Sequence, residues 1–284
     1  MSDKNFFEEL GNDSPFMKVA LEGFAGSGKT YTAALMAKGL HQAIKSTKPI
    51  VIFDTERSSR FLKPIFAEAG IKVLVKESRQ LVDLIKTMEL CRDGASDILL
   101  IDSISHVWEA YLEAYKEKNR RTFLQFQDWG IIKPTWKKSF SEPLVAARFN
   151  IIFTGRAGYE YEQEKNEVTQ KKEIVKSGIK MKVEGETAYE PDLLVLMERF
   201  EQVLGDKEKL VWREATILKD RSDLIDGITF KDPTWESFKP VFDFLSGDVV
   251  PERERKEGDT GELFKTDNSL DEIMRKKKIE LEKI

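Results

Sequence analysis

The chain of 284 residues has little of several things, and each shortage excludes a class of protein. A single cysteine, Cys91, has no second cysteine to pair with, which excludes a scaffold held by internal disulfides. No apolar run approaches the roughly 18 residues of a membrane-spanning helix. The first residues, MSDKNFFEEL, lack the basic and apolar regions of a signal peptide. We therefore expect a cytoplasmic protein with no membrane segment.

Basic residues are not in excess either. The 46 Lys and Arg residues are balanced by 50 Asp and Glu residues, and the pI is near 5.6. This balance argues against a globally basic nucleic-acid coat and leaves room for a local basic patch. The two histidines, His41 and His106, stand apart from any cluster of metal-ligating residues, so we expect structural roles for both. The hydrophobic share of 40% is enough for a sizeable core.

Short apolar runs alternate with stretches that have helical spacing. The expected strands are residues 16–21, 50–54, 71–75, 98–102 and 150–154. The expected helices include 30–42, a stretch ending at Ala69, 80–91, most of 103–149 and a helix at 233–245. This alternation predicts βαβ units and a parallel sheet. Residues 193–204 and 210–218 resemble antiparallel strands that complete the sheet, and the polar stretch 159–187 predicts a long loop or an exposed hairpin.

These patterns predict three parts of the chain. Residues 1–15 form an N-terminal loop, 16–246 a single α/β domain, and 247–284 a charged linker followed by a helix. Ser269 and Glu272 have the spacing of a capping box at the start of that last helix. The apolar residues of 269–284 suggest a partner-binding helix, and a solvated tail is the alternative.

The most specific motif is GFAGSGKT at residues 23–30. It matches G-x-x-x-x-G-K-[ST] in full, with Gly23, Gly28, Lys29 and Thr30 at the fixed positions. Glycines let backbone N–H groups wrap the phosphates, the lysine supplies a positive charge, and the threonine hydroxyl is a ligand for Mg²⁺. The motif predicts ATP and Mg²⁺ as ligands. The remaining residues expected around the nucleotide are Ala25, Gly26, Ser27 and Tyr31.

Two carboxylates complete the expected site. Asp102 ends the apolar run ILLID, where such folds place the acid that secures magnesium. Ser103 follows it, so a second acid that acts on water must come from elsewhere in the chain. Glu56 is the candidate for that role, and the alternative is that it only begins a helix.

Three segments resemble the RecA-like branch of phosphate-loop ATPases. Asp54, Thr55 and Glu56 look like the strand-end D-[AT]-E segment of RecA-type recombinases, and ILLIDS resembles the family's Walker B ending. LKDRSD looks like the K-x-R finger of RecA and DnaB-type hexamers, at Lys219 and Arg221, and the alternative is a solvated strand end. The order of the elements resembles small phage-type nucleotide-binding (AAA-domain) proteins that act with single-strand annealing or recombination systems.

The resemblance implies a RecA-like α/β core, with a mainly parallel sheet flanked by helices and antiparallel strands added on the C-terminal side. It also implies ATP hydrolysis in a ring or filament of identical subunits. Glu56 would orient the attacking water, while Lys219 and Arg221 would reach a neighbour's γ-phosphate. The family's sensor strand usually ends in an amide or histidine, whereas this one reads FTGRAG and leaves only Thr154 and Arg156 as polar candidates. A phosphate-sensing role is one interpretation of Arg156.

In RecA-like proteins two loops line the path of single-stranded DNA, and the matching stretches here are about 117–130 and 157–187. Both combine basic with aromatic residues, which suits neutralised phosphates and stacked bases. The first offers Lys116, Lys118, Arg120, Arg121, Phe123, Phe126 and Trp129, and the second offers Tyr159, Tyr161 and several lysines including Lys180 and Lys182. The alternative for the second stretch is a solvated charged hairpin.

Two other functions share the phosphate loop. One is a small-molecule kinase, which usually closes an arginine-rich lid over its substrate, and the chain has no such segment. The other is an ATP-dependent adaptor that organises a recombination or replication partner with little catalysis.

Overall fold

A nine-stranded mixed sheet forms the centre of the fold. The computed structural model describes residues 15–165, 172–204 and 209–247. The strands are β1 (Lys18–Gly23), β2 (Ile50–Asp54), β3 (Val73–Glu77), β4 (Ile98–Asp102), β5 (Asn150–Lys165), β6 (Lys172–Met181), β7 (Leu193–Val203), β8 (Lys209–Asp220) and β9 (Thr229–Lys231). Their order is β3-β2-β4-β5-β1-β7-β8-β9, and β6 pairs with β5 outside this path.

The strands from β3 to β7 in this order run parallel, and the strands added beyond them run antiparallel. β7 is parallel to β1, and β8 pairs antiparallel with β7. The prediction of an α/β fold with antiparallel strands on its C-terminal side is therefore confirmed. Because parallel neighbours end at the same edge, the ends of β1, β2, β4 and the core part of β5 meet there.

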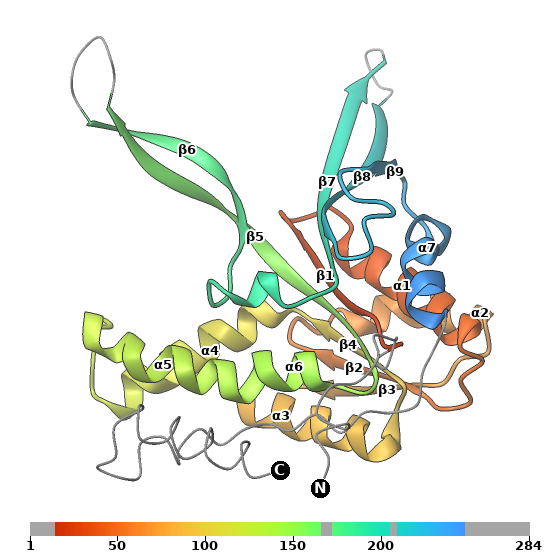
Figure 1. Ribbon diagram of the computed structural model, residues 1–284, viewed down its shortest axis with the longest axis horizontal. Helices are drawn as coiled ribbons and strands as arrows, with labels where there is room; N and C mark the ends of the chain where they lie inside the picture. Colours follow the sequence, from red (N-terminus) through yellow and green to blue (C-terminus); the bar gives the residue numbers. More distant parts are fainter. Residues whose placement is uncertain (1–14, 166–171, 205–208, 248–284) are drawn as a thin grey trace, which may run out of the picture. The chain divides into compact units, whose positions relative to one another are not determined.

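Helices cover both faces of the sheet (Figure 1). α1 (Lys29–Ala43), α2 (Lys63–Glu68) and α7 (Trp235–Ser246) share one hydrophobic core with the sheet. α3 (Leu81–Leu90), α4 (Ile104–Lys118), α5 (Trp129–Trp136) and α6 (Glu142–Ala146) share the other. The short turns of helix are η2 (Ser59–Leu62), η3 (Cys91–Ala95), η4 (Phe126–Asp128), η5 (Lys137–Ser141) and η6 (Thr187–Tyr189).

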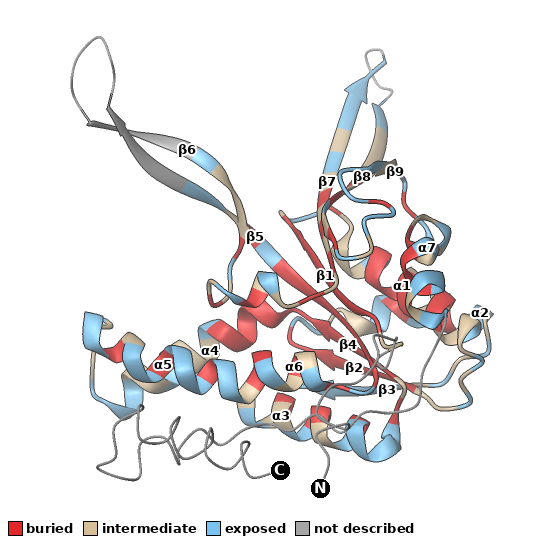
Figure 2. Cartoon of the chain, in the orientation of Figure 1, coloured by how far each residue is buried: buried red, intermediate tan, exposed pale blue. Residues whose placement is uncertain are grey.

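Strand β4 shows why the central strands read as continuous apolar runs. Ile98 and Leu100 face the core with α1, while Leu99 and Ile101 face the core with α4. Both faces are covered, so every position of the strand is buried (Figure 2). Asp102 is the last residue of this buried strand.

Of the two alternatives for residues 159–187, the hairpin is the one observed, because β5 continues past the core to Lys165 and pairs antiparallel with β6. The structure differs from the expected elements elsewhere. Thr229–Lys231 form an edge strand that was not expected. The helix expected before Ala69 is shorter, beginning with the 3-10 turn Ser59–Leu62.

Residues 15–246 group into one unit of the chain. The N-terminal loop and the expected partner-binding helix at 269–284 lie outside the described residues. Within the described ranges, no helix is long and apolar enough to cross a membrane.

Candidate nucleotide-binding site

The loop at 23–30 joins β1 to α1 at the edge where the parallel strands end. Gly26 and Gly28 have φ values of 76° and 93°, a conformation that suits glycine. Gly23 is fixed by its surroundings, because a Cβ there would lie 2.3 Å from the Met197 carbonyl oxygen. The loop therefore has the left-handed backbone and the close strand contact that a phosphate cradle requires.

Lys29 lies across this loop. Its Nζ donates hydrogen bonds of 2.9 Å to the carbonyl oxygens of Gly23 and Phe24. Burial is the main cause that lowers the pKa of Lys29, and the positive charge of Arg156 adds to it, while Asp102 and Glu56 act in the opposite direction. The ammonium group thus stands within the electrostatic reach of both acids.

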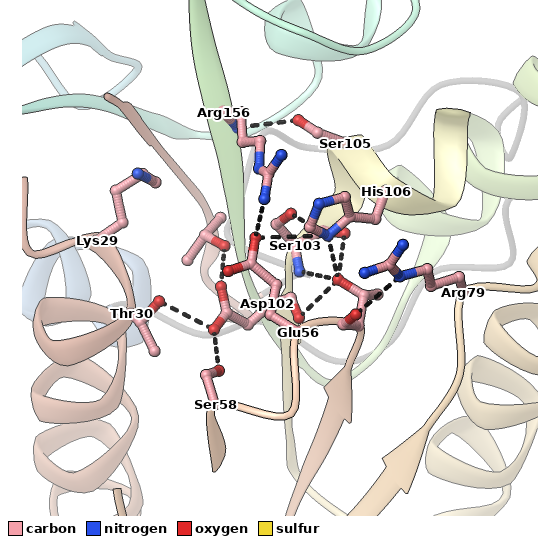
Figure 3. A network of polar contacts seen from close by, with 12 residues as sticks. Lys29, Thr30, Glu56, Ser58, Arg79, Asp102, Ser103, Ser105, His106 and Arg156 are labelled. Carbon is pink, nitrogen blue, oxygen red and sulfur yellow. Dashed lines mark hydrogen bonds and ion pairs between the residues drawn. The ribbon is translucent and has the colours of Figure 1, made fainter. Parts of the chain in front are cut away.

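Asp102 gathers hydroxyl groups from three other elements (Figure 3). Its Oδ2 accepts hydrogen bonds from Thr30 at 2.9 Å and Ser58 at 2.7 Å, and its Oδ1 accepts one from Thr154 at 2.5 Å. The side chain is buried at 2% exposure. Thr30 and Asp102 form the oxygen-rich pair that would hold Mg²⁺, a cation that prefers oxygen ligands.

Asp54 shapes the turn that carries Glu56. It lies beside Asp102 because β2 and β4 are parallel neighbours. Its carboxylate accepts hydrogen bonds from the N–H groups of Glu56, Ser58 and Ser59 at 2.9, 3.2 and 2.8 Å. Burial alone would raise the pKa of Asp54, but these hydrogen bonds outweigh it and the pKa is lowered. Asp54 is thus a positioning residue for the turn.

Glu56 extends from this turn toward two groups on neighbouring elements. Its Oε1 lies 3.2 Å from Arg156 Nη2 and 3.4 Å from His106 Nδ1. His106 is also 2.9 Å from the Thr55 hydroxyl, which accepts a hydrogen bond from the Ser103 N–H. Burial, followed by the charge of Arg156, lowers the pKa of His106, so the neutral imidazole is favoured.

These side chains line a cavity of about 580 Å³. The predicted residues on its wall are Gly23, Ala25, Gly26, Gly28, Lys29, Thr30, Tyr31, Glu56 and Asp102. The wall also includes Phe24, Ser103, Ala157 and Lys182, which were not placed there from the sequence, and Arg156, a candidate from the sensor strand. Ser27 is buried, and its Oγ lies 3.5 Å from Lys29 Nζ.

Comparison with protein families gives a match over most of the chain. The family model described as "AAA domain" matches residues 16–222. The chain belongs to this AAA-domain family. Its members have P-loop domains of the ATPase type, which agrees with the nucleotide-binding site built above. No curated protein matches the chain.

Two arginines of the AAA domain approach the phosphate loop from the β7–β8 hairpin. A Cβ on Gly28 would lie 3.2 Å from Arg213 Cγ, and one on Gly26 would lie 3.8 Å from Arg199 Cδ. Both arginines belong to β strands, in which the alternation of side chains indicates only which face of the sheet each residue lies on. The sequence therefore carries no signal for their contact with the phosphate loop. His106 did carry one, because it lies four residues after Asp102 in the first turn of α4.

Lys219 and Arg221 lie elsewhere in the AAA domain. Lys219 is level with Leu194 and hence with the start of β1, whereas the phosphate loop follows the end of β1. Lys219 Nζ donates to the carbonyl oxygens of Tyr189 and Pro191, and Arg221 pairs with Asp192 at 3.1 Å. The chain does not bring this pair to its own site, so the predicted finger role would require a second copy.

The described residues hold no cluster of three or more histidine, cysteine or acidic side chains suited to a metal ion. The Mg²⁺ site expected here is of a different kind, because most of its ligands would come from the nucleotide and water.

Proposed function

We propose that this AAA-domain protein binds MgATP and hydrolyses it to ADP and phosphate. The observation that carries the proposal is the contact of 2.9 Å between Thr30 and Asp102, in a cavity that also contains Lys29 and Glu56. A glycine turn formed by chance would not be expected to have the carboxylate from the end of another strand hydrogen-bonded to its threonine. The arrangement therefore supports phosphoryl transfer more than a purely structural turn.

Each residue has a part in the proposed reaction. The loop N–H groups and Lys29 would bind the β- and γ-phosphates, and Glu56 would accept a proton from the attacking water. The water oxygen forms a bond to the γ-phosphorus while the bond to the bridging oxygen breaks, and that electron pair leaves with ADP. Bound Mg²⁺, held through Thr30 and Asp102, would neutralise charge on the phosphates.

Substitution of Lys29 tests this proposal. We expect Lys29→Ala to weaken binding of a fluorescent ATP analogue at least tenfold, because a charged hydrogen-bond donor to the phosphates is lost. Phosphate release should fall with it. Lys38→Ala is the matched control, since Lys38 lies on the same helix but pairs with Glu68 outside the cavity. Equal binding and turnover in the wild type and the Lys29 variant would refute the assignment.

We propose that the ATPase uses ATP hydrolysis to act on single-stranded DNA, in recombination or replication. Phe123 and Phe126 support this, because they are 80% and 95% exposed on the segment between α4 and α5. Two basic residues are exposed beside them, Lys118 at the end of α4 and Arg120 on the segment itself. Exposed aromatic rings beside basic groups are the combination that stacks bases and neutralises phosphates.

Three other residues expected to contact DNA are engaged within the fold. Lys116 pairs with Glu113, and Arg121 pairs with the buried Asp128 at 2.9 Å. Trp129 stacks on Trp108 with ring centroids 6.4 Å apart. The DNA-contacting group proposed for this segment is therefore smaller than the sequence suggested.

The second expected DNA segment begins at the cavity wall. Arg156, Ala157 and Lys182 line the cavity at the base of the β5–β6 hairpin, and Tyr159 packs against Phe24 of the phosphate loop at 4.8 Å between ring centroids. Lys180 pairs with Glu160. The hairpin base would therefore respond to the nucleotide, and the hairpin beyond it is proposed to contact DNA.

A homo-oligomer is proposed on one ground from the fold. Since Lys219 and Arg221 lie at the opposite edge of their own sheet, they would act on a nucleotide only across a subunit boundary. The adaptor alternative differs in a measurable way, because an adaptor would bind ATP through Lys29 without needing Glu56.

A further inference from the structure

We propose that Arg156 alternates between two anionic partners, the Glu56 carboxylate and the terminal phosphate of the bound nucleotide. Glu56 would be free to act on water only when a triphosphate has drawn Arg156 away. This inference rests on the proposed ATPase function. It adds a residue that makes the activity conditional on the γ-phosphate.

The first support is the position of Arg156. Its backbone lies next to the phosphate loop, because Arg156 is in register with Gly23 in the parallel pair β1–β5. Two hydrogen bonds fix that backbone: the Arg156 N–H donates to the Ser105 hydroxyl at 2.9 Å, and the Lys182 N–H donates to the Arg156 carbonyl at 2.7 Å. The side chain alone is left to move, between a fixed strand and the cavity that it lines.

The second support is the nature of the ion pair. A single contact of 3.2 Å joins Arg156 to Glu56, and the two side chains are 50% and 34% exposed. Among the described residues, Glu56 is the one carboxylate within ion-pair distance of Arg156. An ion pair this exposed is weak, whereas a phosphate with more than one negative charge offers a stronger partner. The exchange therefore favours the phosphate.

The third support is that Glu56 keeps a second contact when Arg156 leaves. His106 Nδ1 lies 3.4 Å from Glu56 Oε1, and His106 is buried and held by Thr55 at 2.9 Å (Figure 3). Asp54 holds the turn from the other side through the Glu56 N–H. Glu56 would thus stay at the cavity after its ion pair with Arg156 is broken, and its carboxylate would be available to water.

The exchange predicts different effects on ATP and ADP, which lacks the γ-phosphate. Affinities for ADP and for a non-hydrolysable ATP analogue are measured by calorimetry on the full chain. Arg156→Ala should lower the preference for the ATP analogue over ADP roughly tenfold, because one charge-assisted hydrogen bond to the terminal phosphate is lost. Glu56→Gln should raise affinity for the ATP analogue about threefold, because Arg156 no longer has to leave an ion pair. ADP affinity should not change in that variant.

The double variant and a neighbouring arginine provide the controls. In Arg156→Ala the added Glu56→Gln change should have no further effect on the ATP analogue. Arg57→Ala should match the wild type, because Arg57 adjoins Glu56 in sequence but pairs with Glu77. An unchanged ATP-to-ADP preference in Arg156→Ala, or an equal gain from Glu56→Gln with and without Arg156, would overturn the exchange. If Lys29→Ala bound the ATP analogue as tightly as the wild type, the proposed function itself would be overturned.

Discussion

Three acids lie around the phosphate loop, and their surroundings give them different parts. Asp102 is enclosed by the hydroxyl groups of Thr30, Ser58 and Thr154, which suits a ligand of a cation. Asp54 accepts hydrogen bonds from backbone N–H groups, so its carboxylate stabilises the turn that carries Glu56. Glu56 faces the cavity, and it is the acid that we propose to act on water. Residue type alone does not separate these parts, whereas the hydrogen-bond partners do.

Glu22, one residue before the phosphate loop, is a fourth acid with a testable pH effect. It is buried at 1% exposure, and burial is the main cause that raises its pKa to about 7, with the charge of Glu160 adding to it. The folded chain therefore binds a proton there that the unfolded chain has released. The stabilisation from this proton is full below the ordinary pKa of about 4.3 and is lost as the pH rises through about 7.

Replacing Glu22 by glutamine should remove this dependence. At pH 8 we expect Glu22→Gln to be more stable than the wild type by about 2–3 kcal/mol, and the two unfolding curves should converge below a pH of about 4.5. Urea unfolding at pH 4.5, 6 and 8 measures the difference. A constant difference across this range would contradict the raised pKa.

The segment between α4 and α5 shows how an ion pair to a buried acid can hold exposed rings in place. Asp128 is 2% exposed and accepts hydrogen bonds from Arg121, Tyr115 and the Gln125 N–H at 2.9, 3.2 and 2.7 Å. These contacts fix the turn on which Phe123 and Phe126 stand. Large apolar side chains that are held outside the core on a fixed segment are typical of a surface that binds a partner.

Changes to these rings should affect DNA binding without affecting folding. Phe123→Ser and Phe126→Ser should each weaken binding of single-stranded DNA roughly tenfold, as expected for loss of a stacked base, while the melting temperature stays the same. Phe244→Ser, an exposed phenylalanine on α7, is the matched control. Fluorescence anisotropy at two salt concentrations measures the affinity, which should fall with salt. Equal affinity in all variants would exclude this surface as the DNA site.

Sequence patterns predict the elements best where burial is uniform on both faces. The strands 50–54 and 98–102 were predicted at the residues observed, since continuous apolar runs mark strands buried from both sides. Strand β9, with the sequence TFK, has no such run and gains its hydrogen bonds from β8. The outer part of β5 is polar and pairs only with β6, so a hairpin and a loop could not be told apart.

The site was predictable to the extent that it lies on fixed motif positions. The phosphate loop and Asp102 follow from spacing and from strand ends, and the parallel sheet then brings Glu56 beside them. The contacts of Arg156 and His106 with Glu56, and the approach of Arg213 to Gly28, join elements that are distant in the chain, so a local pattern marks these residues at most as candidates and does not give their partners. The placement of Lys219 and Arg221 depends on strand register, which the KDR motif does not contain.

Across the whole fold, β5 links the nucleotide site to the hairpin. Its core residues pair with β1 and β4, Arg156 lines the cavity, and the same strand then continues into the pair with β6 (Figure 1). A change at the cavity would therefore be transmitted along one hydrogen-bonded strand. This continuity predicts that DNA acts on ATP turnover through the hairpin.

Shortening the hairpin tests that link. Residues 161–177 can be replaced by a two-residue turn, because Glu160 and Gly178 face each other in the register. The shortened chain should keep its ATP affinity and its turnover without DNA, because the cavity residues remain, and should lose stimulation by single-stranded DNA. Steady-state phosphate release with and without DNA is the readout. Stimulation that survives the deletion would place the link elsewhere.

The central claim is that Glu56 makes this AAA-domain protein a hydrolase as well as a nucleotide-binding protein. Single-turnover phosphate release from MgATP, measured beside ATP affinity for the wild type and Glu56→Gln, tests it most directly. We predict that the variant binds ATP at least as tightly as the wild type and releases phosphate at least about a hundredfold more slowly, the scale of a lost general base. Equal rates of release in the two proteins would contradict the claim and leave the adaptor as the better account.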